Sequence, residues 1–365
     1  MELLNFLQHY WWAVVSLLGA LLVFLLFVQG LQSLLLRTAC TTEHKDLVCQ
    51  YAGHKWEITF TTLVTFGGAA FASFPLFYST SFGGAYWAWI VILLLFVIQA
   101  ISFEFRNAVG NIVGPRLFEI FLFLNGALGT FVLGVAVGTL FSGGAFVMEK
   151  TAITDISNPA ISYWANGWHG LDALADPFNL LLGLVVFFAA RTLGLLFAIS
   201  KSDSGELGDI CRRKLLLSAA PFVLLFVAFV VWLFLRTGYR ANASGVFEAV
   251  DYAYLKAMVE NPWILILLLL GVVGVLAGLI LQILGKQQDK NFYIVGGGVV
   301  LAVWALLLSA GFSGNAYYIS TVNPQMSLDL ANSSSSPFPL KVMASVALAV
   351  PFVVAYIGWA WRKMR

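Results

Sequence analysis

Charged side chains are scarce in this chain of 365 residues, where Asp, Glu, Lys and Arg together make up only 10 %. Soluble domains carry about 25 %. Hydrophobic residues reach 60 %, and the mean hydropathy is +0.88. This composition excludes an ordinary soluble globular protein and indicates a chain that crosses a membrane several times.

Histidine and cysteine are also scarce, with four and three residues. The histidines lie in loops or at the ends of apolar stretches: His9, His44, His54 and His169. The cysteines lie between apolar stretches, without CxxC spacing: Cys40, Cys49 and Cys211. We therefore expect no metal, haem or copper centre held by this chain's own ligands, and no disulfides. Phosphate-binding glycine loops and a nucleophile elbow are missing too, and no basic, aromatic-rich surface points to nucleic acid.

Long apolar stretches dominate what is present. Nine are long enough to cross a hydrocarbon core of about 30 Å. They predict an all-α polytopic protein with one integral membrane domain over residues 1–365, with helices at about Tyr10–Leu36, Ile58–Ser79, Ala85–Phe103, Leu117–Phe141, Phe178–Ser200, Leu215–Leu235, Trp263–Leu284, Phe292–Phe312 and Val342–Trp361.

Basic residues are distributed unevenly between the connecting segments. Of 20 Lys and Arg residues, fourteen fall in one alternate set of segments: Arg37, Lys45, Lys55, Arg106, Arg116, Lys201, Arg212, Arg213, Lys214, Lys286, Lys290, Arg362, Lys363 and Arg365. The other set, although longer, holds five, and Arg191 lies inside a stretch. The positive-inside rule predicts a cytoplasmic membrane protein with its N-terminus outside and its C-terminus in the cytoplasm.

The longest loops fall on the predicted outer side: Ser142–Pro177, Arg236–Pro262 and Ser313–Pro339. We expect short surface helices in these loops, bounded by prolines, because proline cannot continue a preceding helix. Glycine-rich faces in several stretches predict a tightly packed helix bundle.

A few ionisable or polar residues lie at membrane depth, where they are costly and therefore candidates for function. Glu57 begins the second stretch and Glu104 ends the third, both on the predicted cytoplasmic side. Gln29 and Gln32 lie near the cytoplasmic end of the first stretch. The two acids therefore cluster on the side from which a proton would be taken up.

Structural explanations compete with this hypothesis. A helix dipole favours Glu57 at a helix N-terminus whatever its function. Glu104 and Arg106 can be interfacial residues. Arg191 can be a snorkelling or helix-pairing residue, for which we expect Glu57 or Glu104 as the counter-ion. Glu119 and Arg116, three residues apart, are expected to form a local pair.

Several motifs resemble subunit II of the cytochrome bd quinol oxidases. The likeness is strongest from Trp56-Glu57 through Gly67-Gly68-Ala69 and Phe74-Pro75 to Phe103-Glu104-Phe105-Arg106. Trp11-Trp12 matches the double tryptophan that opens the first helix of that family. Gln29-Gly30-Leu31-Gln32 falls where many members carry Asp-Gly-Phe-Asp, and Ala331-Asn332-Ser333 resembles the segment before the last helix.

The resemblance implies two four-helix bundles plus one peripheral helix, paired with a like-folded subunit I. In that family subunit I holds two b-type haems and haem d, and subunit II supplies no haem ligand. The complex oxidises quinol and reduces dioxygen to water in the bacterial cytoplasmic (inner) membrane, and turnover is electrogenic without proton pumping. The chain would not be catalytic alone. A small single-helix subunit and a structural quinone stay open.

Carried over residue by residue, Glu57 matches an acidic residue that lines a proton route at the subunit interface. Gln29 and Gln32 stand where the family has aspartates, so they can orient water but cannot titrate. Trp56, Arg106 and Asn332 are taken as structural or interface residues, and so is Arg191, although it matches no motif of the family.

Two other functions remain as alternatives. A stand-alone secondary transporter or channel would be expected to show inverted repeats and broken helices, and no convincing repeat is present. A purely structural scaffold would leave Glu57 and Glu104 as ordinary interfacial charges.

Overall fold

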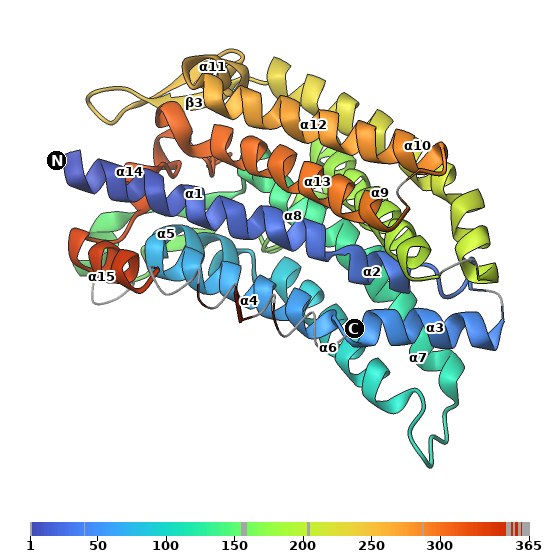
Figure 1. Ribbon diagram of the computed structural model, residues 1–365. Coiled ribbons are helices and arrows are strands. Elements are labelled where there is room, and N and C mark those ends of the chain that lie inside the picture. Colours follow the sequence, from blue (N-terminus) through green and yellow to red (C-terminus); the bar gives the residue numbers. More distant parts are fainter. Residues whose placement is uncertain are drawn as a thin grey trace.

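The structure is a computed structural model that describes residues 2–39, 41–154, 159–202, 205–286 and 288–347, together with positions 352, 355, 356 and 359. Cys40, Arg362, Lys363, Arg365 and much of the predicted ninth span lie outside the described residues. Long helices run side by side between two ends of the molecule (Figure 1). We call these the α3 end and the α11 end, after the helices α3 (Thr42–Gly53) and α11 (Ala253–Glu260) that lie there.

The helices that form the body are α1 (Glu2–Leu25), α2 (Phe27–Gln32), α4 (Trp56–Ser73), α6 (Tyr86–Phe105), α7 (Pro115–Leu124), α8 (Thr130–Ser142), α9 (Pro177–Lys201), α10 (Glu206–Leu235), α12 (Pro262–Ile283), α13 (Gln288–Gly311) and α15 (Pro337–Ala347). Proline is the first residue of α7, α9 and α12, where its missing N–H costs no helical hydrogen bond. Asp176 caps α9 by accepting a 2.9 Å hydrogen bond from the amide of Phe178.

Seven helices in the described residues are long and apolar enough to cross a membrane. They correspond to seven of the nine predicted stretches and confirm a helical membrane protein: Glu2–Gln32, Tyr86–Phe105, Pro115–Ser142, Pro177–Lys201, Glu206–Leu235, Pro262–Ile283 and Asp289–Gly314. The predicted span from Ile58 to Ser79 is divided at Phe74, because Pro75 begins the short helix α5 (Pro75–Tyr78). Nine complete spans are therefore not confirmed.

Helix α9 is the most buried of these seven, with 67 % of its most apolar stretch inside the protein, against 28 % for α10. It packs against α2, α8, α10 and α13. Lipid tails are as apolar as leucine, so close approach rather than hydrophobic burial drives such packing. Where α2 crosses α9, a Cβ on Gly30 would lie 1.8 Å from the carbonyl oxygen of Ala190, so only glycine fits.

In the described residues, two π-helical turns interrupt the regular helices. η1 (Ser79–Gly84) follows α5, and η2 (Asn125–Gly129) joins α7 to α8. Neither was predicted, because a π-turn hardly changes the hydropathy pattern. Such turns often occur at functional sites.

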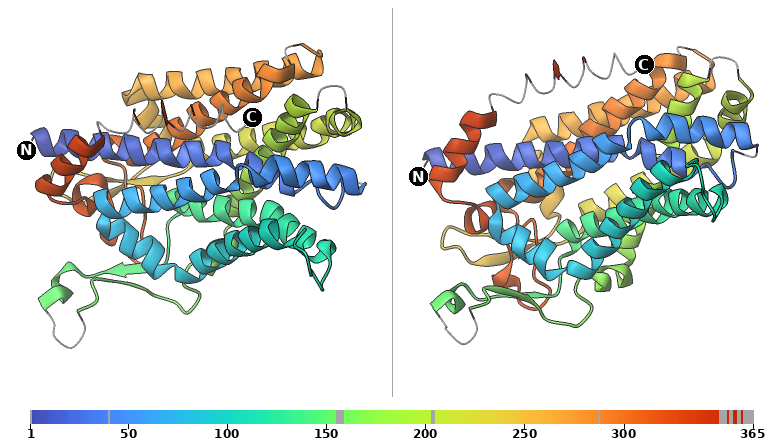
Figure 2. Two further views of the ribbon diagram at one scale, coloured as in Figure 1. Left: turned by 60° about the horizontal axis from the view of Figure 1, so that its bottom comes forward. Right: turned by 90° about the horizontal axis from the view of Figure 1, so that it is seen from below.

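The α11 end contains the short elements of the predicted outer loops. Two antiparallel hairpins, β1 (Phe146–Met148) with β2 (Ser162–Trp164) and β3 (Gly238–Ala241) with β4 (Phe247–Val250), were not predicted. The predicted short helices are present as η3 (Lys150–Thr154), η4 (Leu171–Ala175), α11 (Ala253–Glu260), η5 (Phe312–Gly314), η6 (Pro324–Met326) and α14 (Leu330–Ser333). Figure 2 shows the segment that carries β1 and β2 projecting beyond the helices.

Hydrogen bonds fasten the start of α1 to α13, to α15 and to the segment between α14 (Leu330–Ser333) and α15. Gln8 donates a 2.7 Å hydrogen bond to the hydroxyl of Ser334. The indole N–H groups of Trp11 and Trp12 donate to the carbonyls of Leu340 and Leu307, at 3.1 and 3.0 Å. The double tryptophan therefore has a structural explanation.

Candidate functional site

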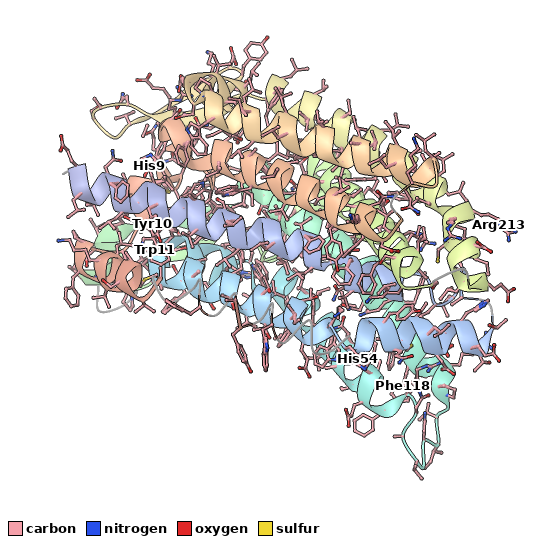
Figure 3. The ribbon with its side chains drawn as sticks, viewed as in Figure 1. His9, Tyr10, Trp11, His54, Phe118 and Arg213 are labelled. Carbon is pink, nitrogen blue, oxygen red and sulfur yellow. The ribbon has the colours of Figure 1, made fainter. Side chains whose placement is uncertain are left out.

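A polar pocket of about 400 Å³ opens at the α3 end, between α3 (Thr42–Gly53), α4 and α6. Its lining includes Glu57, Glu104, Asp46, His54 and Arg106. The sequence placed Glu57 and Glu104 on one side of the membrane, and the structure brings them to one pocket. Figure 3 shows His54 and Arg213 at this end and His9, Tyr10 and Trp11 at the other.

The two glutamates are positioned by the first turn of α4 and the last turn of α6. Beside them Trp56 and Phe103 stack with ring centroids 6.3 Å apart and planes 17° apart, which joins the two helix ends. Both Glu57 and Glu104 are exposed in the isolated chain. Among the described residues neither forms an ion pair, so both carboxylates are accessible to water or to a partner.

A buried ion-pair network lies beside the pocket. Glu119 of α7 is 3 % exposed and accepts hydrogen bonds from Lys45 at 2.7 Å and from Arg106 at 2.9 Å. Arg106 also binds Asp46 at 2.6 Å. The predicted local pair of Glu119 with Arg116 is wrong, because Glu119 turns inward toward α3 and α6 while Arg116 is exposed. The network joins the ends of α3, α6 and α7.

Cys49 lines the same pocket, facing this network. Burial raises the pKa of its thiol to about 11, and the positive charge of Arg106 offsets only part of that effect. The thiol is therefore protonated at neutral pH.

Gln29 and Gln32 do not line the pocket. They lie deeper, in a cluster of four amide side chains with 0 % exposure, together with Gln99 of α6 and Asn125 of η2. Gln99 Oε1 accepts hydrogen bonds from Gln29 at 2.8 Å, Gln32 at 2.6 Å and Asn125 at 2.5 Å. Sequence reasoning missed Gln99 and Asn125, although each is an amide inside an apolar stretch and could have been found by that criterion.

Arg191 does not pair with Glu57 or Glu104, so that prediction is wrong. Its guanidinium donates to the backbone carbonyl of Ser33 at 2.7 Å, to the hydroxyl of Thr38 at 3.3 Å and to that of Ser218 at 3.2 Å. Ser33 is the C-cap of α2, and a cation at a helix C-terminus is favoured by the helix dipole. Arg191 is a helix-pairing residue in this structure.

Asn332 lies at the α11 end, far along the molecule from the pocket. It forms a capping box with Asp329 at the start of α14, and its backbone carbonyl accepts a 2.8 Å hydrogen bond from Lys150. Burial raises the pKa of Asp329, and the backbone N–H groups of Asn332 and Ala331 offset part of this effect. Asn332 thus shapes the loop before α15.

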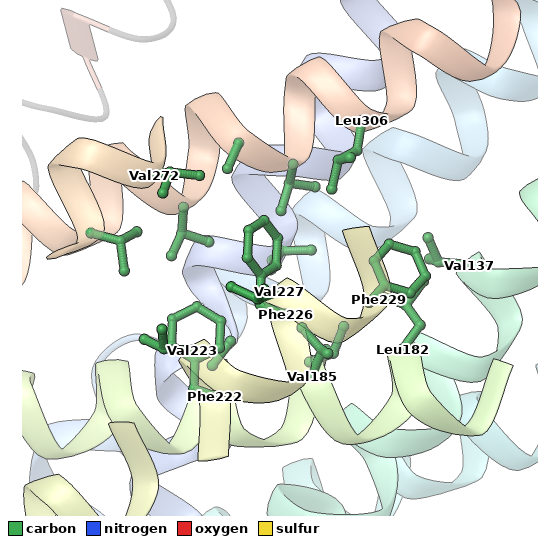
Figure 4. A pocket seen from close by; sticks show the side chains of 18 of the residues that line it. Val137, Leu182, Val185, Phe222, Val223, Phe226, Val227, Phe229, Val272 and Leu306 are labelled. Carbon is green, nitrogen blue, oxygen red and sulfur yellow. The ribbon is translucent and has the colours of Figure 1, made fainter. Parts of the chain in front are cut away.

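A second cavity, of about 110 Å³, lies between α8, α9, α10, α12 and α13 (Figure 4). Its walls are apolar side chains such as Val137, Val185, Phe226, Val272 and Leu306. A hydrocarbon chain fits such walls. A quinone ring would find no side-chain hydrogen-bond donor for its carbonyl groups there.

The four histidines lie in different surroundings. His54 lines the pocket at the α3 end, His44 contacts Glu206 at 3.7 Å, and the ring of His169 stacks on Tyr86. His9 lies at the opposite end and interacts with the carbonyl of Asn5. In the described part of the chain no three His, Cys, Asp or Glu residues gather where they could hold a metal ion.

Comparison with known proteins identifies the family and the fold. The family model for cytochrome bd terminal oxidase subunit II matches residues 7–364. The chain belongs to this family.

The similarity to individual relatives extends over nearly the whole chain. The probable cytochrome oxidase subunit 2 of Haemophilus influenzae is 26 % identical over 99 % of this chain and 94 % of its own length. Cytochrome bd-I ubiquinol oxidase subunit 2 of Escherichia coli K12 is 25 % identical, with coverages of 98 % and 94 %. A chain in the structure of bd oxidase from Geobacillus thermodenitrificans has the same fold, with a TM-score of 0.64, 15 % identity and coverages of 100 % and 99 %.

The chain is therefore subunit II of a bd-type oxidase, a component of a quinol oxidase complex that contains haem and a partner subunit. It is a protein of the bacterial cytoplasmic (inner) membrane. The alternative of a stand-alone transporter or channel is not favoured.

Proposed function

We propose that this bd subunit II supports the haem-bearing subunit I and lines a path for protons from the cytoplasm. The observation that carries the proposal is the pocket at the α3 end, which places Glu57 and Glu104 together on an open surface. Carboxylates can pass protons through intervening water, and the reduction of dioxygen to water consumes protons.

The exposed face of α4 supports a partner beside Glu57. This α4 face consists of Glu57, Thr61, Val64, Thr65, Gly68 and Phe71, all exposed in the isolated chain. By contrast, the exposed side chains of α12 at membrane depth are aliphatic, including Leu269, Leu270 and Val273. Hydroxyls and glycine favour a helix–helix interface, whereas aliphatic side chains suit lipid. We assign subunit I to the α4 face.

In this arrangement Glu57 lies at the edge of the interface and Glu104 lies beside it. Gln29 and Gln32 orient water deeper in the protein, and since amides do not titrate, Glu57 carries most of the proton relay. Trp56 and Arg106 position the helix ends, and Arg191 and Asn332 stabilise the fold.

The remaining assignments follow the family. Subunit I would hold two b-type haems and haem d, and the complex would use quinol to reduce dioxygen, without proton pumping. The single membrane domain would have nine spans, as two four-helix bundles plus a peripheral helix, with the N-terminus outside and the C-terminus cytoplasmic. A structural quinone would have to place its ring outside the apolar cavity.

The first test is a reduced-minus-oxidised optical spectrum of the tagged chain, purified alone and after co-expression with subunit I. We expect haem b and haem d bands only from the co-purified complex. Folded chain that carries haem by itself would contradict the assignment of all haems to the partner.

The second test is Glu57→Gln in the intact complex. We expect dioxygen reduction at saturating quinol to slow by about tenfold or more, because a relay group contributes about 10²–10⁴ when it transfers the proton directly. Haem content should be unchanged. Glu2→Gln, an exposed glutamate at the opposite end, is the matched control. Unchanged turnover of Glu57→Gln would refute the proton role.

A further inference from the structure

The buried amide cluster has hydrogen-bonding groups that the protein does not satisfy. Gln29 Oε1, Gln99 Nε2 and Asn125 Oδ1 are buried and have no hydrogen-bond partner among the described residues. Buried polar groups in proteins are nearly always paired, with protein or with ordered water. Three unpaired atoms in one cluster therefore indicate that a small molecule or ion binds there.

The result does not depend on how the amides are oriented. If all four terminal amides were rotated by 180°, nitrogen and oxygen would exchange places. Gln29, Gln99 and Asn125 would still each have one unpaired atom, with donors and acceptors reversed. In either orientation the three unpaired atoms include both a donor and an acceptor.

The presence of both donors and acceptors among the unpaired atoms indicates which kind of molecule binds there. A cation would be repelled by the amide N–H that faces it, and an anion by the carbonyl oxygens. No ionised side chain belongs to the cluster to neutralise either. Water donates and accepts, so it matches both kinds of group, and buried waters typically make about three hydrogen bonds.

The backbone supports the same assignment. Asn125 is the first residue of the π-helical turn η2, which packs directly on α2. A Cβ on Gly126 would lie 2.5 Å from the carbonyl oxygen of Gln29, so the turn holds Asn125 against α2. A π-turn leaves the regular α-helical hydrogen-bond ladder, and proteins retain such turns frequently where they bind something.

We propose that Gln29, Gln32, Gln99 and Asn125 form an internal, uncharged water-binding site. Asn125 is six residues beyond Glu119 on the continuous α7–η2 helix, or about 9 Å at 1.5 Å per residue. The site therefore lies deeper than the ion-pair network at the pocket. This site deepens the proposed function, in which Gln29 and Gln32 orient water, by adding Gln99 and Asn125. It would hold water even if Glu57 relayed no protons.

The test is a density map of the intact complex with subunit I, at a resolution where ordered waters are visible. We expect a peak about 2.7–3.2 Å from the terminal atoms of at least two of Gln29, Gln99 and Asn125. An empty site, in a map that shows waters on other buried polar groups, would overturn the proposal. So would a peak with the short, multiple oxygen contacts of a metal ion.

A pair of variants at Gln99 sharpens the test. Gln99→Met keeps the side-chain length but removes both Nε2, a proposed water contact, and the acceptor that Gln29, Gln32 and Asn125 share. Three further N–H groups then lack a partner, so we expect the water density to shift toward them and the thermal midpoint to fall by several degrees. Gln99→Glu keeps an acceptor for all three N–H groups and should retain the peak. Gln282→Met, at a buried amide elsewhere, is the control that should leave the peak in place. Water density in Gln99→Met at the same position and with the same contacts as in the unmodified complex would refute the site.

Discussion

At the scale of single residues, the environment of a charge decides its role. Glu57 and Glu104 are open to the pocket, whereas Glu119 is enclosed by Lys45 and Arg106. Sequence spacing could identify all three as unusual in a membrane protein. It could not distinguish them, because the partners of Glu119 come from segments 74 and 13 residues away.

Breaking the enclosed pair should be costly. Glu119→Ala leaves Arg106 and Lys45 without their shared carboxylate, and removing one partner of a buried pair typically costs about 3–5 kcal/mol. We expect a large drop in the thermal midpoint of the complex. Asp209→Ala, which breaks the exposed pair with Arg212, should cost only about 0.3–0.5 kcal/mol. Equal losses in the two variants would contradict the assignment of Glu119 to the core.

Cys49 should react slowly with alkylating reagents. With a pKa of about 11, the thiolate fraction at pH 8 is about 10⁻³, roughly two orders of magnitude below that of an ordinary cysteine. The rate should rise about tenfold per pH unit between pH 7 and 10. Timed alkylation followed by mass spectrometry, with denatured protein as the reference, measures it. Rapid modification of the native complex at pH 7 would show that the pKa is not raised.

At the scale of elements, hydropathy was a reliable guide to the long helices and a poor one to their interruptions. Leu117–Phe141 was predicted as one helix, and it is one, but with a π-turn at Asn125 that no hydropathy pattern shows. The break at Phe74 could have been read from Pro75. The two hairpins were missed because strands of three or four residues are too short for an alternating pattern to be recognised.

The close crossing of α2 and α9 requires glycine at position 30, because there is no room for a methyl group. Gly30→Ala would force these helices apart, because the added carbon would occupy the position of the Ala190 carbonyl oxygen. We expect a loss of about 1–3 kcal/mol or more, measured by thermal unfolding of the complex. Gly297→Ala is the matched control, since nothing lies within 4 Å of its added Cβ. It should be neutral or stabilising by up to about 1 kcal/mol.

At the scale of the whole molecule, the two sides differ in what they expose. The α4 face carries hydroxyls, a glycine and Glu57, while α10 and α12 expose leucine, isoleucine and valine. The sequence alone could not assign these faces, since threonine and glycine in a span also occur inside a bundle. Only the packing of the helices in the structure shows that this face of α4 is exposed rather than buried in the bundle.

Two glycines allow the partner face to be tested directly. Gly68 on the α4 face and Gly297 on α13 are both exposed, with nothing within 4 Å of an added Cβ. Gly68→Phe should wedge subunit I away and reduce the haem that co-purifies with the tagged chain by at least about tenfold, equivalent to 1.4 kcal/mol. Gly297→Phe should leave it unchanged. Normal haem recovery in Gly68→Phe would place subunit I elsewhere.

The hydrogen bonds that fasten α1 also have a consequence for biosynthesis. Its partners Leu307, Ser334 and Leu340 come 295 to 329 residues later in the chain. At about 5–20 residues per second, the ribosome needs roughly 15–65 s to make them after α1 has emerged. During that time Gln8, Trp11 and Trp12 have not met their native partners. The first helix to enter the membrane is thus among the last to be completed, and the nascent chain must tolerate or shield it until then.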